Sequence, residues 1–355
     1  MKKAGKTLFI IIMVLTISLR MVYLLGPVDP NADRSIQLII KKGTTAGQIA
    51  NRLYENNLIR SKLLFNILIS IQGLENSLQA GTYDIKTSYG MGHIIYLLVE
   101  GRVATFRVTI PEGFTVEEVT GRLSVMTPYS KEEYLNYAKQ DMGRDYLKVS
   151  GKEIKYALEG FLYPDTYIIP ITYTPEQIFE VMLSVFEERW LDRLNRISYS
   201  KNSNFDLSQK RESSKQEDFN EIVSQFTTHQ IMTIASLIEE EAKLNEEKPL
   251  VAAVIYNRLK RNMLLQIDAC IQYIMSNRKD RVLYSDLGID SPYNTYMYRG
   301  LPPGPISNPG ASSIEAALNP ADVDYLFYFA RKDGSHVFSH SYKEHMELQY
   351  EMRDN

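Results

Sequence analysis

The 355-residue sequence predicts an α+β protein with an N-terminal transmembrane helix, a small α+β module and a larger C-terminal domain of mixed α+β structure. Two observations favour this division. An apolar run covers residues 7–28, and short strand-like segments alternate with helical ones in the chain that follows. We therefore predict three regions: the anchor at residues 1–28, the module at 29–104 and the C-terminal domain at 105–355.

The first 28 residues predict an uncleaved signal-anchor. Lysines precede the apolar run Thr7–Val28, which is long enough to cross a hydrocarbon core of about 30 Å as a helix. Basic residues before a span stay cytoplasmic, so we expect a single-pass protein of the cytoplasmic (inner) membrane with its C-terminal bulk extracytoplasmic. Arg20 can snorkel to the interface. A cleaved signal peptide is the alternative, but this region contains no small-x-small cleavage site.

Composition excludes several function classes. The formal net charge is -3, and no basic stripe interleaved with aromatics follows the N-terminus, so nucleic acid is not an expected partner. Cys270 is the single cysteine, and neither it nor the 5 histidines form a cluster at metal-ligand spacing. The sequence also has no phosphate-binding glycine loop. We therefore expect no metal and no cofactor.

Residues 29–104 read as a compact module of short elements. The pattern predicts strands at 36–42 and 81–86 and helices at 45–56, 61–71 and 92–99. The run Lys42–Ala50 resembles the opening of a LysM-like domain, a module that contacts glycan in many proteins. A purely structural spacer is at least as well supported by these residues.

The C-terminal region predicts mainly helices with a closing pair of strands. Strands are expected at 105–110, 325–330 and 336–339, and helices at 115–123, 131–139, 175–194, 231–244, 249–261, 271–275 and 312–318. The segments 160–167 and 300–310 read as ordered loops because of their proline and glycine, and each suits either a groove wall or packing. The polar segment 198–220 predicts a flexible surface insertion.

The helix expected at Ile231–Leu244 carries the candidate chemistry. At about 100° per residue its apolar face contains Ile231, Ile234, Ala235, Ile238 and Ala242. Glu240 is then expected on the opposite, solvent-facing side, and Glu239 and Glu241 at the two margins of the apolar face. Partial desolvation there would raise the pKa of a carboxyl group toward the range of a general acid. A solvated charge run that ends a core helix is the alternative.

Four stretches together resemble one family. They are Leu158–Tyr167, Ala235–Glu241, Val251–Leu259, and Ser291–Tyr296 with Gly300–Gly310. In order and spacing they are similar to the MltG (YceG-like) endolytic murein transglycosylases across most of residues 36–350. The resemblance implies a peptidoglycan-cleaving enzyme that is fixed in the cytoplasmic membrane and faces the wall, with a lysozyme-like glutamate on a helix of the C-terminal domain.

The resemblance also implies roles for individual residues. The family's catalytic acid lies in an Ala-Ser-x-x-Glu-x-Glu run, which points to Glu241, with Glu239 as the alternative. The family often has Gln-Thr-Asp-Pro-Thr where this chain has Gln266-Ile267-Asp268-Ala269-Cys270. The substrate-binding candidates are Asn257, Gln266, Asp268, Tyr293, Asn294 and Tyr296. Each has a structural alternative: Asn257 could cap a helix and the tyrosines could pack in the core.

The implied reaction cleaves the MurNAc-β-1,4-GlcNAc bond of nascent peptidoglycan and leaves a 1,6-anhydroMurNAc end, with a single glutamate acting first as acid and then as base. Ordinary glycosidases use two carboxylates instead. A hydrolytic muramidase, with Glu239 or Asp268 as the partner carboxylate, and a non-catalytic wall-binding division scaffold are the alternatives. The expected partners are peptidoglycan glycan strands, the membrane through residues 7–28, and wall-synthesis or division proteins.

Overall fold

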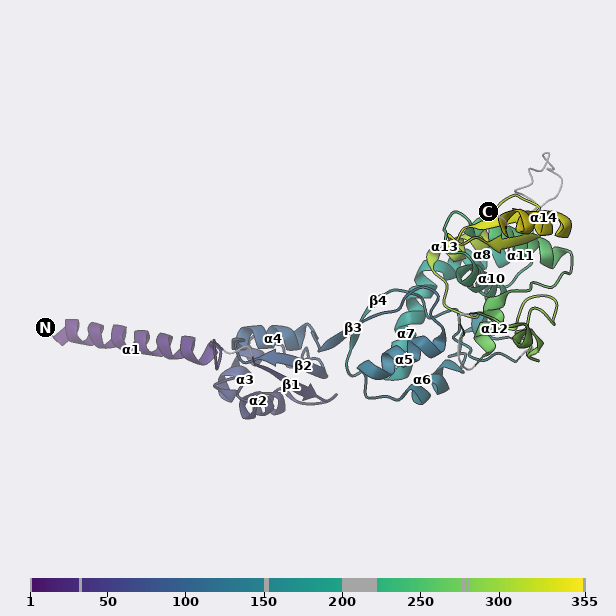
Figure 1. The fold of residues 1–355 in the computed structure, drawn as a ribbon. Coiled ribbons are helices and arrows are strands. Elements are labelled where there is room, and N and C mark those ends of the chain that lie inside the picture. The colour runs from purple at the N-terminus through teal and green to yellow at the C-terminus, as the bar shows by residue number, and fades with distance from the viewer. Residues whose placement is uncertain are drawn as a thin grey trace, which may run out of the picture. The chain divides into compact units, whose positions relative to one another are not determined.

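The computed structural model describes residues 2–31, 34–149, 153–199, 222–275, 279 and 281–353. The chain divides into two compact units, residues 1–107 with 168–173 and residues 108–167 with 174–355. Helices and strands occur in both units, so the prediction of a mixed α+β protein is confirmed (Figure 1). The predicted roles of the regions 1–28, 29–104 and 105–355 stay predictions.

The first unit contains a small α+β fold behind an N-terminal helix. Its elements are α1 (Lys2–Leu25), β1 (Ser35–Ile40), α2 (Ala46–Glu55), α3 (Lys62–Ile71), β2 (Gly81–Lys86) and α4 (Met91–Val99). Strands β1 and β2 pair antiparallel, with Ser35 opposite Lys86 and Ile40 opposite Gly81. The helices pack with this two-stranded sheet over a buried apolar cluster that includes Ile49, Leu53, Phe65, Tyr83 and Ile94.

Side-chain caps explain where the helices of this unit begin. The Thr45 hydroxyl accepts a hydrogen bond from the Gln48 amide, and the Gln48 side chain accepts one from the Thr45 amide, which together form a capping box. Ser61 caps α3 in the same way through the amide of Leu64. These caps lie at the predicted starts of both helices. Whether the unit is LysM-like stays a prediction.

Helix α1 covers most of the segment that we predicted to span a membrane. Among the residues that the structure describes, none of the helices combines the length and the apolar character that a membrane crossing requires. Our prediction of a transmembrane helix at residues 7–28 is therefore not confirmed.

The second unit is mainly helical. Its helices are α5 (Val116–Met126), α6 (Lys131–Ala138), α7 (Pro175–Phe186), α8 (Asp192–Tyr199), α10 (Thr228–Glu241), α11 (Lys248–Lys260), α12 (Asp268–Ile274), α13 (Ala311–Leu318) and α14 (Tyr342–Arg353). Short helical turns occur at η1 (Asp145–Leu147), η2 (Glu187–Leu191) and η4 (Tyr284–Gly288). Strand β5 (Phe327–Ala330) pairs antiparallel with β6 (His336–Ser339). A third two-stranded sheet is formed by β3 (Thr105–Thr109) and β4 (Thr166–Pro170), and each of these strands has residues in both units.

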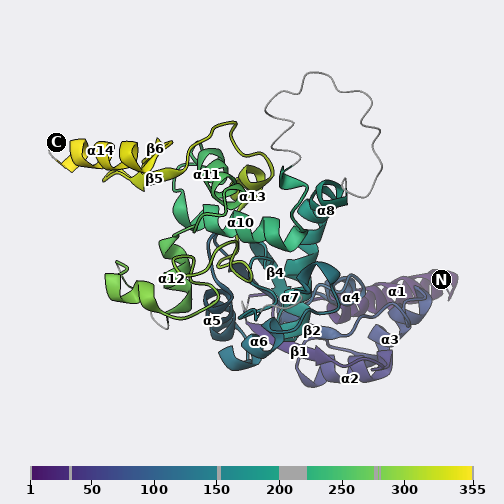
Figure 2. The same ribbon diagram turned by 90° about the vertical axis from the view of Figure 1, so that its right-hand side faces the viewer.

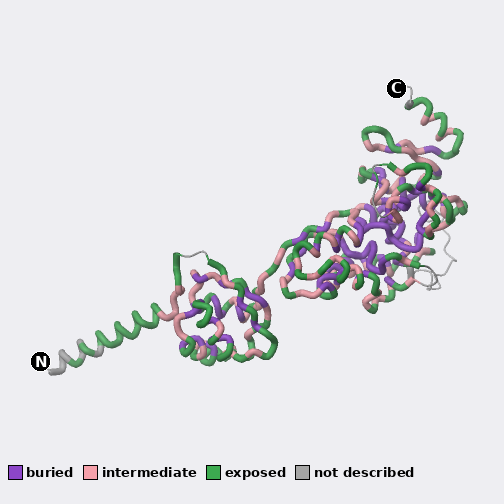
Figure 3. The backbone as a smooth tube through the Cα atoms, turned by 60° about the horizontal axis from the view of Figure 1, so that its bottom comes forward, coloured by how far each residue is buried: buried purple, intermediate pink, exposed green. Residues whose placement is uncertain are grey.

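Helix α10 is the central helix of this unit. It packs against α8, α11, α12 and α13, and Figure 2 shows α11 and α13 beside it. Every side chain from Ile231 to Ile238 is buried, so α10 is enclosed on all sides and does not present the single apolar face that we expected. Glu240, which we expected on the solvent-facing side, is half-buried. The buried backbone of the core is drawn in purple in Figure 3.

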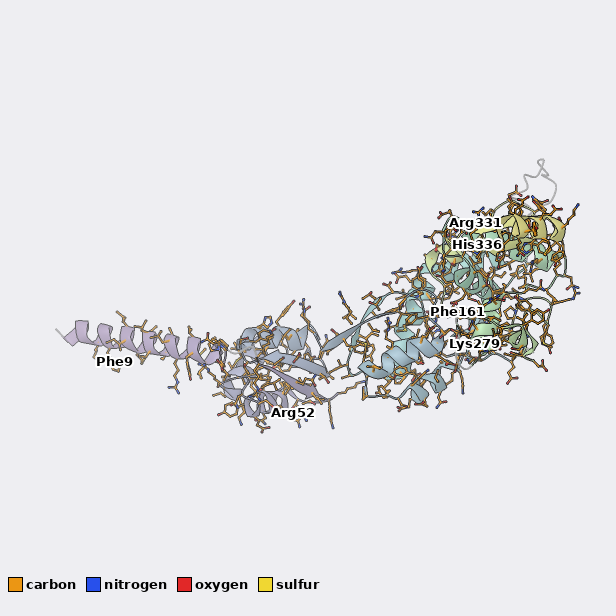
Figure 4. All side chains as sticks on the ribbon, viewed as in Figure 1. Phe9, Arg52, Phe161, Lys279, Arg331 and His336 are labelled. Atoms are coloured by element: carbon orange, nitrogen blue, oxygen red, sulfur yellow. The ribbon has the colours of Figure 1, made fainter. Side chains whose placement is uncertain are left out.

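The two predicted loops are packed into this core. Residues 302–310 are all buried, and the Asn308 side chain joins the loop to two other segments: it accepts from the Leu162 amide at 2.8 Å and donates to the Phe114 carbonyl at 2.7 Å. Phe161, labelled in Figure 4, packs edge-on against Phe186 with the ring centroids 5.2 Å apart. Both segments therefore shape the core. Packing, one of our two alternatives, explains them.

The elements differ from the sequence prediction in several places, and the helix expected at 231–244 begins and ends three residues earlier, as Thr228–Glu241. Strand β4 begins inside the segment that we expected to be a loop, and α14 was not predicted. The single helix expected at 175–194 is α7 followed by a π-helical turn and α8, which continues to Tyr199. The helix expected at 271–275 begins three residues earlier, at Asp268. Most of the predicted insertion at 198–220 lies outside the described residues.

Candidate active site

The C-terminal end of α10 opens on a cavity. The helix begins at a capping box formed by Thr227 and Gln230 and ends at Glu241, because Ala242 takes an extended conformation (φ -100°, ψ 115°). Glu241 is thus the last residue of the helix, and it lines the cavity beyond the helix end. The cavity has a volume of about 440 Å³. Its lining residues are Glu241, Arg258, Leu265, Gln266, Asp268, Tyr296, Phe327, Tyr328, Phe329, Ala330, His336, Tyr342 and His345.

Tyr328 fixes the Glu241 carboxyl group. The Tyr328 hydroxyl, on β5, donates a hydrogen bond of 2.9 Å to Oε2 of Glu241. Burial raises the pKa of Glu241, the hydrogen bond from Tyr328 opposes this effect, and the negative charge of Asp268 adds to it. The net result is a raised pKa, which favours the protonated form that a general acid needs.

A second carboxyl group lines the same cavity. Asp268 is the first residue of α12, and its Oδ1 accepts a hydrogen bond from the Tyr296 hydroxyl. Gln266 precedes it in a left-handed conformation (φ 54°), and its backbone amide donates to the Thr295 carbonyl at 3.1 Å. The structure therefore brings four predicted residues, Glu241, Gln266, Asp268 and Tyr296, to one cavity.

A buried arginine also reaches this cavity. Arg258, on α11, is 8% exposed; its Nε donates to the Leu326 carbonyl at 2.6 Å and its Nη1 to the Leu265 carbonyl at 2.7 Å. Its guanidinium group lies 5.1 Å from the centre of the Phe327 ring. Burial lowers the pKa of Arg258. These bonds hold the hairpin and the segment before α12 against α11.

Glu239 lies near Glu241 in sequence but has a different environment. Its Oε2 accepts hydrogen bonds from the Gly310 amide at 3.1 Å and the Ser313 hydroxyl at 2.6 Å, and it lies 3.2 Å from Nζ of the buried Lys248. Gly310 and Ser313 belong to the start of α13, where a carboxylate is favoured by the helix dipole. Glu239 therefore joins three helices and does not line the cavity.

Three of the predicted substrate-binding residues also lie outside this cavity. The Asn257 amide donates to the carbonyls of Val323 and Tyr325, at 2.9 and 3.0 Å. Asn294 is fully buried and donates to the carbonyls of Leu287 and Ile289. Tyr293 is buried, with its ring 5.1 Å from that of Tyr273. Tyr293 packs in the core, which was its structural alternative, whereas Asn257 binds backbone carbonyls outside any helix and does not cap a helix as its alternative stated.

Sequence reasoning missed the contribution of the C-terminal hairpin and of α14. Tyr328, His336, Tyr342 and His345 all line the cavity. His336 is held to the start of α11, since its Nδ1 lies 2.7 Å from Oε2 of Glu247. Tyr342 and His345 are stacked with their rings 6.4 Å apart. The predicted strands at 325–330 and 336–339 located this hairpin, but nothing in the sequence indicated which side chains face Glu241.

No metal centre is evident in the described part of the chain. There, no group of three or more His, Cys, Asp or Glu side chains is arranged to hold an ion. Cys270 is buried, and burial raises the pKa of its thiol. The cavity itself combines Glu241, whose pKa is raised, with a second carboxyl group and a buried cation, an arrangement suited to proton transfer.

Enzymes that cleave glycosidic bonds use a carboxylic acid of raised pKa as general acid, and the wall of this cavity holds a carboxyl group of that kind. The chain belongs to the YceG-like family, whose model matches residues 38–351. The endolytic murein transglycosylase of Bacillus subtilis (strain 168) is 33% identical over 333 residues, which are 91% of this chain and 86% of that protein.

Two further comparisons agree with this assignment. The endolytic murein transglycosylase of Streptococcus pneumoniae (strain D39) is 26% identical over 347 residues, and the match spans 90% of this chain but 58% of that longer protein. The crystal structure of a putative YceG-like protein from Listeria monocytogenes covers 89% of this chain and all of its own, with a TM-score of 0.58 and 30% identity.

Proposed function

We propose that this protein is an endolytic murein transglycosylase of the cell envelope. It would cleave the MurNAc-β-1,4-GlcNAc bond within peptidoglycan strands and leave a 1,6-anhydroMurNAc end, with Glu241 as the catalytic residue. The names of its relatives support the substrate. The observation that carries the assignment of Glu241 is its position at the cavity with a raised pKa, whereas Glu239 is bound to α11 and α13.

In the proposed reaction Glu241 transfers one proton in each direction. Its protonated carboxyl group donates to the oxygen that joins C1 of MurNAc to GlcNAc, and the C1–oxygen bond breaks as the charge on C1 develops. The resulting carboxylate then takes the proton of the C6 hydroxyl of the same MurNAc while O6 bonds to C1. The ring closes without water, and Glu241 is protonated again.

The other cavity residues have supporting roles in this proposal. Tyr328 orients the Glu241 carboxyl group through its hydrogen bond. Asp268, held by Tyr296, helps to keep Glu241 protonated before the first step through its charge. Gln266 and Tyr296 line the cavity and can bind the N-acetyl and hydroxyl groups of the sugars.

One observation favours a second candidate reaction. Asp268 places a second carboxyl group in the same cavity as Glu241. Glycosidases that hydrolyse their substrate use two such groups, one as acid and one as base or nucleophile. A muramidase would therefore use Asp268 to activate water or to attack C1, and its products would carry reducing MurNAc ends.

Product analysis by mass spectrometry tests both reactions. The wild-type protein, the Glu241→Gln variant and the Glu246→Gln variant are each incubated with purified glycan strands. Glu246 is an exposed glutamate just beyond α10 and serves as the matched control. We expect 1,6-anhydro ends from the wild type and the control and none from Glu241→Gln. Reducing ends from the wild type would establish the muramidase, and normal cleavage by Glu241→Gln would reject the catalytic assignment.

Further expectations accompany this function without being part of its test. The cleaved strands are the one partner that the proposal requires. A LysM-like role for the first unit, membrane attachment through residues 7–28, and association with wall-synthesis or division proteins stay predictions, and the proposed chemistry depends on none of them.

A further inference from the structure

A second cavity continues the first one past Glu241. It has a volume of about 200 Å³ and is lined by Glu241, Lys243, Ala330, Arg331, Lys332, Asp333, Gly334 and His336. Three of these residues, Glu241, Ala330 and His336, also line the cavity described above. The Glu241 carboxyl group thus lies where two cavities meet. A chain-like substrate can extend to both sides of it.

The two cavities differ in chemistry. The first is rich in rings, with Tyr296, Phe327, Tyr328 and Tyr342 among its lining residues. The second has three cationic side chains, Lys243, Arg331 and Lys332, which we call the basic arm. Over the described ranges of the chain, none of the three lies within ion-pair distance of a carboxylate. Nη1 of Arg331 donates a hydrogen bond of 3.2 Å to the Ser335 hydroxyl, which is a neutral group, so this bond leaves the charge of Arg331 uncompensated.

One acidic side chain besides Glu241 lines this cavity, and it is already engaged. Oδ1 of Asp333 accepts hydrogen bonds from the Ser335 amide at 3.0 Å and the Ser335 hydroxyl at 2.7 Å. These bonds lower the pKa of Asp333, so it stays ionised and stabilises the turn. With Glu241 protonated, three positive charges face one negative charge, and an anion is favoured there.

The turn holds the basic arm beside the acid. The Arg331 amide donates to the Ser335 carbonyl at 2.7 Å, and Gly334 has a left-handed conformation (φ +87°). The Lys243 side chain passes close to Gly334, where Cδ lies 3.5 Å from the position that a Cβ would occupy. Figure 4 labels Arg331 and His336, which lie next to each other at the end of the hairpin.

We infer that the basic arm binds a carboxylate carried by the lactyl side arm of MurNAc. The inference rests on the proposed function. If Glu241 protonates the oxygen on C1 of a MurNAc, that sugar must lie at the junction of the two cavities. The lactyl group is what distinguishes MurNAc from GlcNAc, and its carboxylate is either free or extended by a peptide that bears carboxylates of its own. The aromatic cavity suits the flat faces of sugar rings.

The size of the effect follows from the exposure of the three cations. Lys243, Arg331 and Lys332 are all exposed, and an exposed ion pair changes an equilibrium by about fivefold at most. Two or three pairs together should therefore change KM by about threefold to tenfold. Salt should weaken this effect, because the charges are accessible to counterions. No change in kcat is expected, since the basic arm does not touch the reacting atoms.

The experiment varies both the charge on the strand and the charge on the protein. The substrates are peptide-bearing strands, strands freed of peptide so that the lactyl carboxylate is exposed, and both kinds after their carboxylates have been converted to methylamides. The test variant is Lys243→Gln/Arg331→Gln/Lys332→Gln. The control variant is Lys139→Gln/Lys260→Gln/Lys343→Gln, which removes three exposed charges that do not line the cavity.

For the wild type and the control we expect KM to rise about threefold to tenfold when the carboxylates are neutralised, and the test variant should not distinguish the substrates. A preference limited to peptide-free strands identifies the lactyl carboxylate, and one limited to peptide-bearing strands identifies the peptide. Equal KM values for charged and neutral strands with the wild type, or a preference that persists in the test variant, would overturn the inference. Failure of the wild type to cleave any strand would instead reject the proposed function.

Discussion

The hydroxyl of Tyr328 lies 2.9 Å from Oε2 of Glu241, although 87 residues separate the two in sequence. This hydrogen bond joins the first strand of the C-terminal hairpin to the last residue of α10. Burial and the neighbouring Glu241 raise the pKa of Tyr328 well above its ordinary value, so Tyr328 stays protonated and remains the donor. The orientation of the proposed acid therefore depends on a residue from a distant part of the chain.

Replacing Tyr328 by Phe should change both the rate and its pH dependence. The hydrogen bond from Tyr328 lowers the pKa of Glu241, so its loss should raise that pKa further and move the alkaline limb of kcat/KM to higher pH. The loss of orientation should reduce kcat about tenfold. Steady-state rates measured across pH check this. Tyr325→Phe, in the same hairpin, should leave the profile unchanged, and an alkaline limb that moved to lower pH would contradict the role given to Tyr328.

Replacing Asp268 by Asn should move the profile in the opposite direction. The charge of Asp268 raises the pKa of Glu241, so the pKa of Glu241 should be lower in the Asp268→Asn variant. The alkaline limb of kcat/KM should therefore begin at a lower pH than in the wild type. The pH dependence of kcat/KM measures this directly. Asp290, which accepts a hydrogen bond from Tyr298 at 2.7 Å outside the cavity, offers a matched control as Asp290→Asn. An identical pH profile for both variants would show that Asp268 does not act on Glu241.

Stability should separate Glu239 from Glu241. Glu239→Gln leaves Lys248 buried without its counter-charge and weakens the contacts with the start of α13, so the free energy of unfolding should fall by about 3 kcal/mol. Glu241→Gln should change it little or increase it. Denaturant titration of both variants gives the comparison. Adding Lys248→Met to Glu239→Gln should recover part of the loss, and equal stabilities for the two single variants would argue against the structural role of Glu239.

A second buried carboxyl group should make the stability of the fold depend on pH. Glu159 accepts hydrogen bonds from the Val116 amide at 2.9 Å and the Tyr273 hydroxyl at 3.0 Å, and burial raises its pKa to about 8. Since the folded pKa lies above the unfolded one, the protonated group favours the folded state at low pH. This contribution is lost as pH rises through about 8.

The variant Glu159→Gln removes this titration. The stability of the wild type relative to the variant should therefore decrease from pH 5 to pH 8, because the Glu159 carboxyl group ionises in the unfolded chain while it stays protonated in the folded protein. Denaturant unfolding at several pH values measures the difference, with the exposed Glu132→Gln as the control. A difference that stayed constant with pH would mean that Glu159 is ionised in the folded protein throughout this range.

Much of the fold could be predicted because local chemistry sets where helices begin. Thr45, Thr115 and Thr174 each form a capping box at or next to a predicted helix start. Strand β4 was missed because its sequence follows a proline-containing segment that reads as a loop, and its partner β3 lies far away in sequence. The residues of a short segment do not reveal which distant strand it pairs with.

The candidate site was less predictable for the same reason. The helical spacing in the sequence could not distinguish Glu239 from Glu241, because both flank the face that we assigned to the core. Their environments differ through residues from other elements: Lys248 and Ser313 for Glu239, and Tyr328 for Glu241. We predicted that the side-chain amides of Asn257 and Asn294 bind the substrate. In the structure both amides donate to backbone carbonyls of residues that only the fold brings close to them.

The hairpin of β5 and β6 has a consequence for the timing of synthesis. The ribosome makes α10, α11 and α12 before Tyr328, so a growing chain can assemble the helices around Glu241 while one wall of the cavity is still missing. Until the hairpin docks, the acid lacks the hydroxyl that orients it. An enzyme that cuts the cell's own wall would thus reach its full rate only after these strands have folded.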